Sequence, residues 1–457
     1  MAVYRVGSNK SSVNNFPVIR PTLDLDFANS KTLDPRITFT RASGGSYVGA
    51  DGLIKYAGVN EARFDHDPAT SESLGLLIEE SRTNLVTRSE DFNFYLSINS
   101  SIIPNTDISP TSTSNATKLI ENTTNLPHYI GVPVGTITPG KYYTFSCFAK
   151  STNPNRLFSL IFENSSLFGG SFPRASFDLI SGKIHTITSA TSAKIENYGN
   201  GWYRCSLTAI PSVTGNTNIQ LRLQTNVTAS SMIGPYTGDG VSNIFIWGAQ
   251  AEEGTFPTSY IPTQGTTRTR QQDIVRIIGS NFSDFYNKNQ GTIVMTYRPT
   301  FDGVYQSPYA HLFSIGNNNL SDSNLSIGLA GNLNSTSQLY FIGYNNLGHF
   351  TWLSTSTPNS KVKQRVVVSY TDSYIRLYQN ELTFSSISPI YGANKSIPDL
   401  IPTITKLSSA NHNALGLGNS PSFFGSSRFN CTIQNFKYYP KELGNEMVKN
   451  LSRKVSP

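Results

Sequence analysis

Charged residues are scarce in this chain, and cysteine is scarcer still. Of the 457 residues, 14% are Asp, Glu, Lys or Arg, and three are cysteines. Three thiols cannot build the disulfide framework of a small secreted domain. Long apolar runs are absent as well: no stretch approaches the ~18 consecutive apolar residues of a membrane helix, and the amino terminus lacks the apolar core of a secretory signal. From these absences we expect folding in a cytoplasm, without membrane insertion.

The sequence motifs of common enzyme classes are missing too. The chain has no H-E-x-x-H metal motif, no P-loop and no G-x-S-x-G nucleophile elbow. Two acidic pairs, Glu79-Glu80 and Glu252-Glu253, offer the residue type that glycoside hydrolysis requires. Adjacent strand residues point to opposite faces, so neither pair places two carboxylates across one cleft. We therefore expect no enzymatic activity, no catalytic residue, no cofactor and no metal; a glycan depolymerase is kept as an alternative.

The positive net charge does not indicate nucleic-acid binding. The charge of +7 comes from 36 basic and 29 acidic residues that are scattered along the chain. A phosphate-reading surface would need a basic stripe with interleaved aromatic rings. The densest basic run, RTRQQDIVR at 268–276, is expected to be a solvated strand or linker. No nucleic-acid partner is predicted.

Ser, Thr, Asn, Gly, Tyr and Phe are abundant instead, and this mixture favours short strands joined by tight turns. The chain is too long for one ordinary core, since domains usually hold ~100–200 residues. We predict an all-β protein with a β-rich attachment region at 1–105, a jelly roll at 106–270 and a second sandwich at 271–457. The boundaries fall in the polar segment 104–115 and in the proline-containing segment 256–270.

Local patterns predict individual elements of this all-β fold. Asp51-Gly52 between two apolar flanks predicts a hairpin turn. The polar residues 379–381 interrupt two strand-like halves and predict a second hairpin. A proline followed by apolar residues at every fourth position predicts a short C-terminal helix over 440–455. The apolar residues of this helix are Leu443, Met447, Leu451 and Val455.

The jelly roll is predicted from eight strand-like runs between residues 128 and 254. Cys147 and Cys205 lie in alternating runs, and we expect them to be small buried hydrophobes. Trp202 and Trp247 lie within strand patterns and are also assigned to the core.

The stretch NEARFDHDP at 60–68 holds the residue types of a metal or acid–base site. In an extended segment Asp65 and Asp67 share one face and His66 points away, so three convergent ligands would need a sharp bend. A proline follows Asp67 and favours a turn, in which Asp usually bonds its own backbone. We therefore expect Glu61, Asp65, His66 and Asp67 to support structure.

Three regions resemble known proteins. Residues 39–92, FTRASGGSYVGADGLIKYAGVNEARFDHDPATSESLGLLIEESRTNLVTRSEDF, resemble a segment found at the front of many tailed-bacteriophage fibre, spike and head-appendage proteins. NGWYRCSLTA (200–209) and NIFIWGAQAEEGTFPTSYIPTQGTTRTR (243–270) are similar to an inner strand and the closing strand of a carbohydrate-binding-module-like jelly roll. VVVSYTDSYIRLYQNELTF (366–384) and FKYYPKELGNEMVKNLS (436–452) resemble concanavalin A-like or laminin-G-like domains.

The resemblance implies a virion component, made in the host cytoplasm, that attaches to the host surface by binding glycans. It implies contacts with tail, baseplate or capsid proteins through the N-terminal region. A capsid decoration protein without receptor binding is a further alternative. Phage fibres and spikes are commonly trimers, and the apolar run SLGLLIEE at 73–80 is expected to need a partner chain. The sequence contains no heptad repeat that would fix the number of subunits, so a dimer is kept as an alternative to the trimer.

Glycan binding needs an exposed aromatic ring and a few amide hydrogen bonds on a shallow β surface. The loop YNNLGHFTW at 344–352 offers both. The candidate glycan-binding residues are Tyr344, Asn345, Asn346, His349 and Trp352. An ordinary hairpin with its tryptophan in the core is the other interpretation. Asp239 in YTGDGVSN has a side chain suited to a structural calcium, although a glycine-flanked turn explains the sequence more simply.

Overall fold

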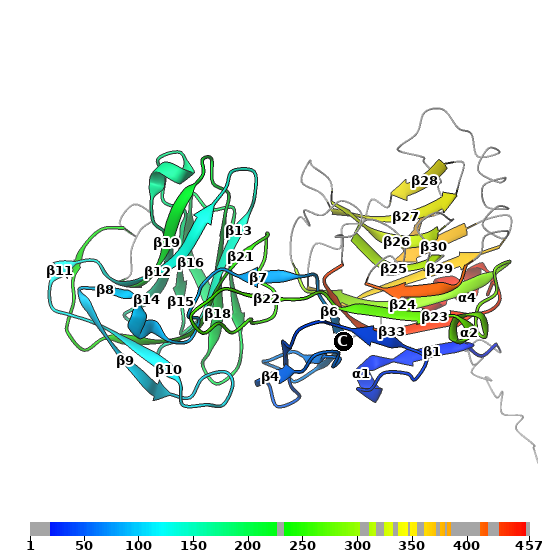
Figure 1. Ribbon diagram of the computed structural model, residues 1–457, viewed down its shortest axis with the longest axis horizontal. Helices are drawn as coiled ribbons and strands as arrows, with labels where there is room; N and C mark the ends of the chain where they lie inside the picture. Colours follow the sequence, from blue (N-terminus) through cyan, green and yellow to red (C-terminus); the bar gives the residue numbers. More distant parts are fainter. Residues whose placement is uncertain are drawn as a thin grey trace, which may run out of the picture.

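The computed structural model shows an all-β protein, as the composition predicts (Figure 1). It describes residues 19–225, 233–301, 310–316, 324–331, 337–345, 348–353, 361–371, 375–379, 382–384, 412–418 and 429–453. The helical turns in these ranges are short: α1 (Phe27–Ser30), η1 (Phe92–Phe94), η2 (Ser165–Phe168), α2 (Ser280–Ser283) and α4 (Asn445–Ser452). Across this described part of the chain, no helix has both the length and the apolar character needed to cross a bilayer.

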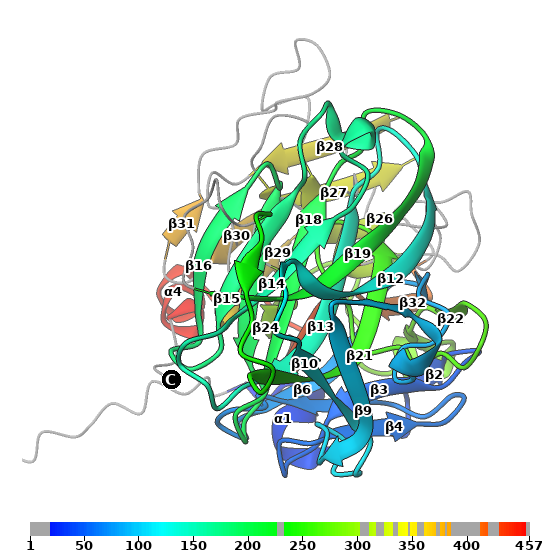
Figure 2. The same ribbon diagram turned by 90° about the vertical axis from the view of Figure 1, so that its left-hand side faces the viewer.

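Twelve strands form the first of two β-sandwiches. They are β8 (Leu96–Ile98), β9 (Ser100–Asp107), β10 (Ala116–Glu121), β12 (His128–Ile137), β13 (Tyr143–Lys150), β14 (Leu157–Phe162), β15 (Arg174–Asp178), β16 (Lys183–Thr188), β17 (Ser192–Asn197), β18 (Tyr203–Ala209), β19 (Gly215–Gln224) and β21 (Asn243–Glu253). One sheet runs β17-β18-β13-β21-β10-β9 and the other β16-β15-β14-β19-β12-β8. A small ribbon joins β11 (Asn125–Leu126) to β20 (Tyr236–Thr237). Figure 2 looks onto this sandwich, with both sheets in view.

The interior of the first sandwich confirms the expected core residues. Cys147 and Cys205 are fully buried and lie directly opposite each other on β13 and β18. Trp202 and Trp247 are buried as well, and pack with Phe148 beside the main core. The eight strand-like runs predicted between residues 128 and 254 all form strands of this sandwich or its edges.

The second sandwich is built from both ends of the chain. Its strands are β1 (Leu23–Asp26), β2 (Thr38–Thr40), β5 (Phe64–His66), β6 (Ser73–Ile78), β23 (Ile274–Ile278), β24 (Gly291–Pro299), β25 (Ala310–Gly316), β26 (Asn324–Gly331), β27 (Ser337–Asn345), β28 (Gly348–Leu353), β29 (Gln364–Tyr370), β30 (Ile375–Gln379), β31 (Leu382–Phe384), β32 (Ala414–Leu417) and β33 (Cys431–Tyr439). One sheet runs β31-β30-β29-β24-β33-β6-β5, with β1 also paired to β33; the other runs β2-β23-β32-β25-β26-β27-β28. The first sandwich is therefore inserted into the second.

This pairing corrects the expected separate N-terminal region at 1–105. β1 and β6 pair with β33, and β2 pairs with β23, so the N-terminal strands belong to the second sandwich (Figure 1). The apolar run at 73–80, expected to need a partner chain, is β6, and its partner is the chain's own β33. The physical reason is that strand edges and apolar faces must be covered, and the chain's two ends cover each other. Sequence patterns cannot show pairing across more than 350 residues.

β6 lies so close to β33 that one position requires glycine. Gly75 has a φ of +89°, and a Cβ there would lie 2.1 Å from the carbonyl oxygen of Ile433. Only a residue without a side chain permits this approach. Gly75 thus lets the N-terminal strand pair with the C-terminal one.

Two smaller elements join the sandwiches. β7 (Arg82–Asn84) enters the first sandwich and β22 (Arg268–Arg270) leaves it, and the two pair side by side (Figure 1). The hairpin of β3 (Gly45–Val48) and β4 (Ile54–Ala57) carries the predicted Asp51-Gly52 turn, which is confirmed. In Figure 2 these N-terminal strands, drawn in blue, lie along the lower edge of the view.

A short C-terminal helix and the second hairpin form as predicted, but the helix begins at Asn445, so that Pro440 and Leu443 precede it. α4 covers the outer face of the large sheet, where Leu443 and Val448 are buried and Met447 and Leu451 pack partly. Gln379, the first residue of the expected tip, is the last residue of β30 and pairs with Leu382 of β31. Val455, also assigned to the helix, lies outside the described residues.

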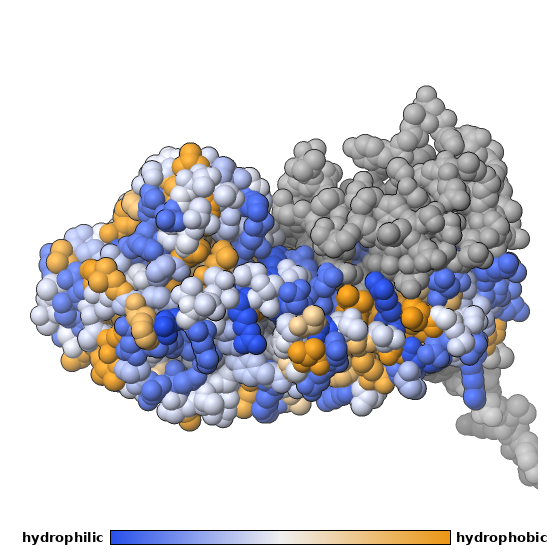
Figure 3. Space-filling view, in the orientation of Figure 1, coloured by the Kyte–Doolittle hydropathy of each residue, from blue (hydrophilic) through white to orange (hydrophobic). Residues whose placement is uncertain are grey.

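Exposed apolar side chains are conspicuous on part of the first sandwich. In Figure 3, apolar atoms appear at its left-hand end, over β8, β9 and β11. On these strands Leu96, Ile103 and Leu126 are 69%, 46% and 48% exposed.

Candidate functional site

The β3–β4 hairpin separates two pockets in the region where the sandwiches meet. Ser46, Ile54 and Tyr260 line both of them. We name the one of about 380 Å³, which contains His66, the inner pocket, and the one of about 760 Å³, which contains Arg270, the outer pocket. Both sandwiches and the N-terminal hairpin thus contribute to one composite region.

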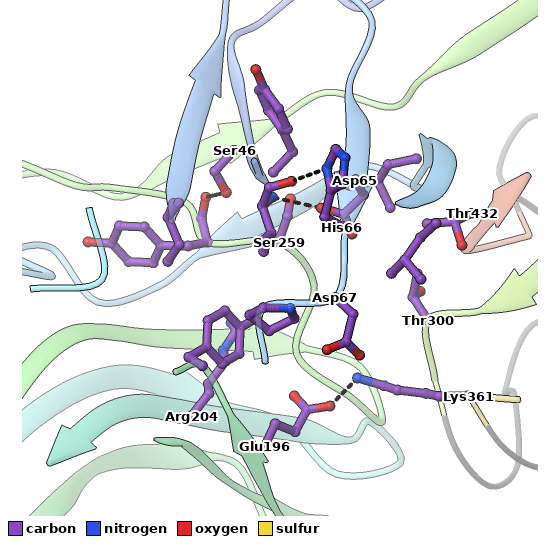
Figure 4. Close-up of a pocket in the computed structure, with 18 of the residues that line it drawn as sticks. Ser46, Asp65, His66, Asp67, Glu196, Arg204, Ser259, Thr300, Lys361 and Thr432 are labelled. Atoms are coloured by element: carbon purple, nitrogen blue, oxygen red, sulfur yellow. Dashed lines mark hydrogen bonds and ion pairs between the residues drawn. The ribbon is translucent and has the colours of Figure 1, made fainter. Parts of the chain in front are cut away.

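The inner pocket lies between the two sandwiches (Figure 4). Glu196 of β17 and Lys361 of the second sandwich form an ion pair across it. Figure 4 shows Asp67 facing this pair from the N-terminal segment. Burial would raise the pKa of Glu196, but the Lys361 ammonium outweighs this effect and lowers it. The ion pair is therefore a direct contact between the two sandwiches.

The polar residues of NEARFDHDP each have a backbone partner. The Gly58 N–H donates to Glu61 at 2.6 Å, and the Val48 N–H donates to Asp65 at 2.7 Å. His66 Nδ1 lies 3.1 Å from the Val48 carbonyl oxygen. Asp67 accepts from two N–H groups of the following turn, as expected for Asp before proline. The stretch holds a hairpin and a turn in place.

One of these carboxyl groups has an unusual protonation equilibrium. Burial raises the pKa of Asp65 to about 7, although the Val48 N–H bond acts in the opposite direction. Asp65 therefore carries a proton over much of the acidic range. This is the one feature of the stretch that resembles an acid catalyst.

Beneath the hairpin lies a buried cluster of charges that the sequence did not reveal. Arg63 donates to Glu79 at 2.7 Å and to Asp273 at 2.5 Å, and Arg41 donates to Asp273 at 2.9 Å. All four side chains, and that of Arg270 beside them, are at most 2% exposed. The run at 268–276, expected to be solvated, instead sends Arg270 and Asp273 into this cluster.

Opposite charges explain the titration of this cluster. Burial alone would raise the pKa of Glu79, but Arg270 and Arg63, helped by Ser259, lower it to about 2. For Arg63, burial acts to lower the pKa, and Asp273 and Glu79 reverse that effect. Glu79 is therefore ionised at neutral pH, and its ion pairs with Arg63 and Arg270 make the cluster a structural ion network.

The outer pocket combines basic, aromatic and polar side chains. Arg268 and Arg270 are two positions apart on β22 and lie on the same face of the strand. Tyr56 of β4 lines the pocket with its side chain 50% exposed. Thr111, Thr113 and Asn115 supply hydroxyl and amide groups from the neighbouring loop. These are the groups that contact a sugar ring and its hydroxyls.

A carboxyl group also lines the outer pocket, and its bonds are satisfied by protein. The Tyr260 hydroxyl donates to Glu90 at 2.9 Å, and the Asn115 amide donates to it at 2.9 Å. Burial raises the pKa of Glu90, which these two bonds only partly offset. The carboxyl group of Glu90 is therefore held by side chains of the protein itself.

The acidic pairs singled out in the sequence are tied to structural partners. Glu79 belongs to the buried cluster, and Glu80 pairs with Arg82. Glu252 accepts from the Thr258 N–H at 2.9 Å, and Glu253 pairs with Lys141 at 2.8 Å. Neither pair faces either pocket with both of its carboxylates.

Asp239 forms the turn expected from its flanking glycines. Its carboxylate accepts from the N–H groups of Val241 and Ser242 at 2.9 and 2.7 Å, and it lies 3.1 Å from Arg156. Among the residues that the structure describes, no group of three or more His, Cys, Asp or Glu side chains is arranged to hold a metal ion.

The glycan-binding residues predicted from the sequence lie on a hairpin. β27 and β28 pair so that Tyr344 stands opposite His349 and Phe341 opposite Trp352. Asn346 and the side chains of Tyr344, Asn345, His349 and Trp352 lie outside the described part of the structure. The backbone thus forms the expected hairpin, and the assignment of a binding site there stays a prediction.

Comparisons with known proteins were made for sequence and for fold. No protein-family model matches the chain, and no curated protein does. The carbohydrate-binding CBM40 domain of the Ruminococcus gnavus IT-sialidase, bound to α2,3-sialyllactose, aligns with 38% of this chain and 88% of its own, at 14% identity and a TM-score of 0.29. Domains LG4–5 of the mouse laminin α1 chain align with 83% of this chain and 98% of their own, at 11% identity and a TM-score of 0.23. Similarities this low carry no argument about function.

Proposed function

We propose that the protein binds glycans without cleaving them, as a structural component of a bacteriophage virion. The observation that carries the binding role is the outer pocket, where the exposed ring of Tyr56 stands among hydroxyl, amide and guanidinium groups. A sugar offers one apolar ring face and many hydroxyls, and this combination matches both kinds of lining group. The virion role rests on the resemblance of residues 39–92 to phage appendage proteins.

The test of glycan binding uses polysaccharide from a host surface. Tyr56→Ala should lower the affinity about tenfold or more, because it removes the ring against which a sugar would stack. Phe94→Ala is the matched control, since Phe94 is 63% exposed and lies outside both pockets. Equal affinity of Tyr56→Ala and the unmodified protein would reject the outer pocket as the site. Absence of binding to any host glycan would reject the proposed function.

A virion role is tested separately from binding. Antibody labelling of intact particles should find the protein on a tail or on the capsid surface. Particles that lack it should adsorb poorly to host cells. Normal adsorption by such particles would favour a decoration protein that cements the shell.

A glycan depolymerase is the second candidate, favoured by one observation. The inner pocket holds Asp65, whose pKa is raised to about 7, and Glu196, whose pKa is lowered. Two carboxyl groups in opposite protonation states are what general acid–base hydrolysis requires. Incubation with host polysaccharide should release no new reducing ends under our proposal. Release that is abolished in a folded Asp65→Asn variant would establish the enzyme instead.

A further inference from the structure

Within the described part of the structure, the guanidinium group of Arg270 lacks hydrogen-bond partners although it is buried. Arg270 lines the outer pocket and is 1% exposed. Its Nη1 and Nη2 atoms have no hydrogen-bond partner among the residues that the structure describes. Its Nε lies 3.4 Å from Glu79 Oε2, an ion-pair contact without hydrogen-bond geometry. The N–H donors on Nη1 and Nη2 of Arg270 are therefore not used by the described part of the protein.

Unused donors of this kind indicate a ligand with paired acceptors. Buried polar groups in proteins are nearly always hydrogen-bonded, because an unsatisfied one costs ~1–3 kcal/mol and a charged one more. The planar guanidinium fork matches the two oxygens of a carboxylate. The other arginines of the buried cluster already follow this rule, since Arg41 and Arg63 each bind a carboxylate of the protein.

The surroundings of Arg270 strengthen the attraction for an anion. Arg268 lies on the same face of β22 and is exposed, and Lys55 lines the pocket from β4. Lys55 pairs with Asp51 at 2.7 Å, but this contact is exposed and therefore weak. Glu90 is the one acidic residue that lines the pocket, and its carboxyl group is already bonded to Tyr260 and Asn115, whereas three basic residues line the same pocket. The balance of charge favours a negative ligand.

We propose that the outer pocket binds an acidic sugar, with the sugar carboxylate on Arg270 and Arg268. The ring of Tyr56 then lies against the sugar ring, and the loop 111–115 faces its hydroxyls. This inference rests on the proposed glycan binding and specifies its chemical class. It predicts preference for host polysaccharides that contain uronic or sialic acids.

The test compares each acidic sugar with its uncharged methyl ester. Trimers of galacturonic acid and of N-acetylneuraminic acid are titrated calorimetrically, each as the free acid and as the methyl ester. We expect at least one free acid to bind ten times or more tightly than its ester, with an affinity that falls as salt rises. Equal binding of acid and ester would overturn the inference and leave the proposed function standing. Binding of neither form by a protein that does bind neutral host glycans would overturn it too.

Simple anions distinguish a sugar site from an ion site. Acetate and inorganic phosphate should bind far more weakly than the sugar acid, because they cannot contact Tyr56 or the loop 111–115. If either binds as tightly, the pocket holds an adventitious ion only, and the inference fails.

Substitutions identify the side chains that bind the sugar carboxylate. Arg270→Lys keeps the charge and removes the fork, and it should lower the affinity for the free acid tenfold or more while leaving binding of the ester unchanged. Arg268 is exposed, so the Arg268→Gln variant should fold normally. It should lower the affinity for the free acid several-fold. Lys183→Gln on β16 is the charge-matched control outside the pocket. If Arg270→Lys fails to fold by circular dichroism, Arg268→Gln decides: an unchanged ratio of acid to ester binding would overturn the assignment.

Discussion

Arg63 and Asp273 stand 210 positions apart in the chain, yet Arg63 Nη2 and Asp273 Oδ2 lie 2.5 Å apart in the buried centre of the molecule. Arg63 precedes the inserted sandwich and Asp273 follows it. The same carboxylate also accepts from Arg41 and from the Glu79 N–H. This ion pair therefore links the chain segment that precedes the first sandwich to the segment that follows it.

Loss of Asp273 should destabilise the protein strongly. Asp273→Asn leaves Arg41 and Arg63 buried without a full counter-charge, which costs ~3–5 kcal/mol. The control is Asp24→Asn, because Asp24 pairs with Lys437 at 3.0 Å across the same fold but in solvent, where such a pair contributes less than ~1 kcal/mol. Urea unfolding measures both free energies. Equal effects of the two substitutions would contradict the structural role of the buried cluster.

The stability of the protein should respond to pH through Asp65. The pKa of Asp65 is raised from its usual 3.8 to about 7, so between about pH 4 and 7 the folded state holds a proton that the unfolded chain has released. The free energy of unfolding contributed by this group therefore falls as pH rises through that window. Asp65→Asn removes the titration and should flatten this part of the profile, as measured by thermal melts at successive pH values. An unchanged slope would show that Asp65 titrates normally.

Glu79 should have the opposite effect at lower pH. Its pKa is lowered to about 2, so between about pH 2 and 4.5 the unfolded chain binds a proton that the folded state excludes. The free energy of unfolding thus rises with pH in this range, and acid protonation of Glu79 weakens the buried cluster. Glu79→Gln should reduce the slope below pH 4.5, and Glu72→Gln, on an exposed carboxylate, should not.

The first sandwich should fold alone, and the second should need the N-terminal strands. The main core of the first sandwich is made of residues from Val86 to Ala251, so an isolated fragment of residues 84–264 should give a cooperative melt. The core of the second sandwich contains Leu23, Leu25 and Leu76, and removal of residues 19–78 also exposes the edge of β33. That truncated chain should aggregate. A soluble, folded product would contradict the shared core.

The protein should form a homo-oligomer, most simply a trimer, in native mass measurements. The N-terminal apolar run cannot supply the interface, because it is buried in the chain's own sheet. The exposed apolar end of the first sandwich is the candidate that we test, and Leu96→Asp should dissociate the oligomer. Lys183→Gln, on an exposed strand elsewhere, should leave the mass unchanged. A monomer at micromolar concentration would contradict the prediction.

The sequence by itself determined the elements whose causes are local. Alternating apolar residues specified the strands, Asp51-Gly52 specified a hairpin, and the four-residue spacing after Pro440 specified α4. Cys147, Cys205, Trp202 and Trp247 were correctly assigned to the core, because large aromatic rings and free thiols in strand-rich segments are usually buried.

Only the tertiary structure decided what pairs over long distances. Arg270 and Asp273 sit in a basic run that looks solvated in sequence, and they are buried because carboxylates and arginines from residues 41–79 meet them there. The apolar run at 73–80 was expected to need a partner chain. Its partner is β33 of the same chain, more than 350 positions later. Ion pairing and strand pairing depend on distance in space, and local patterning contains no information about which distant segments come together.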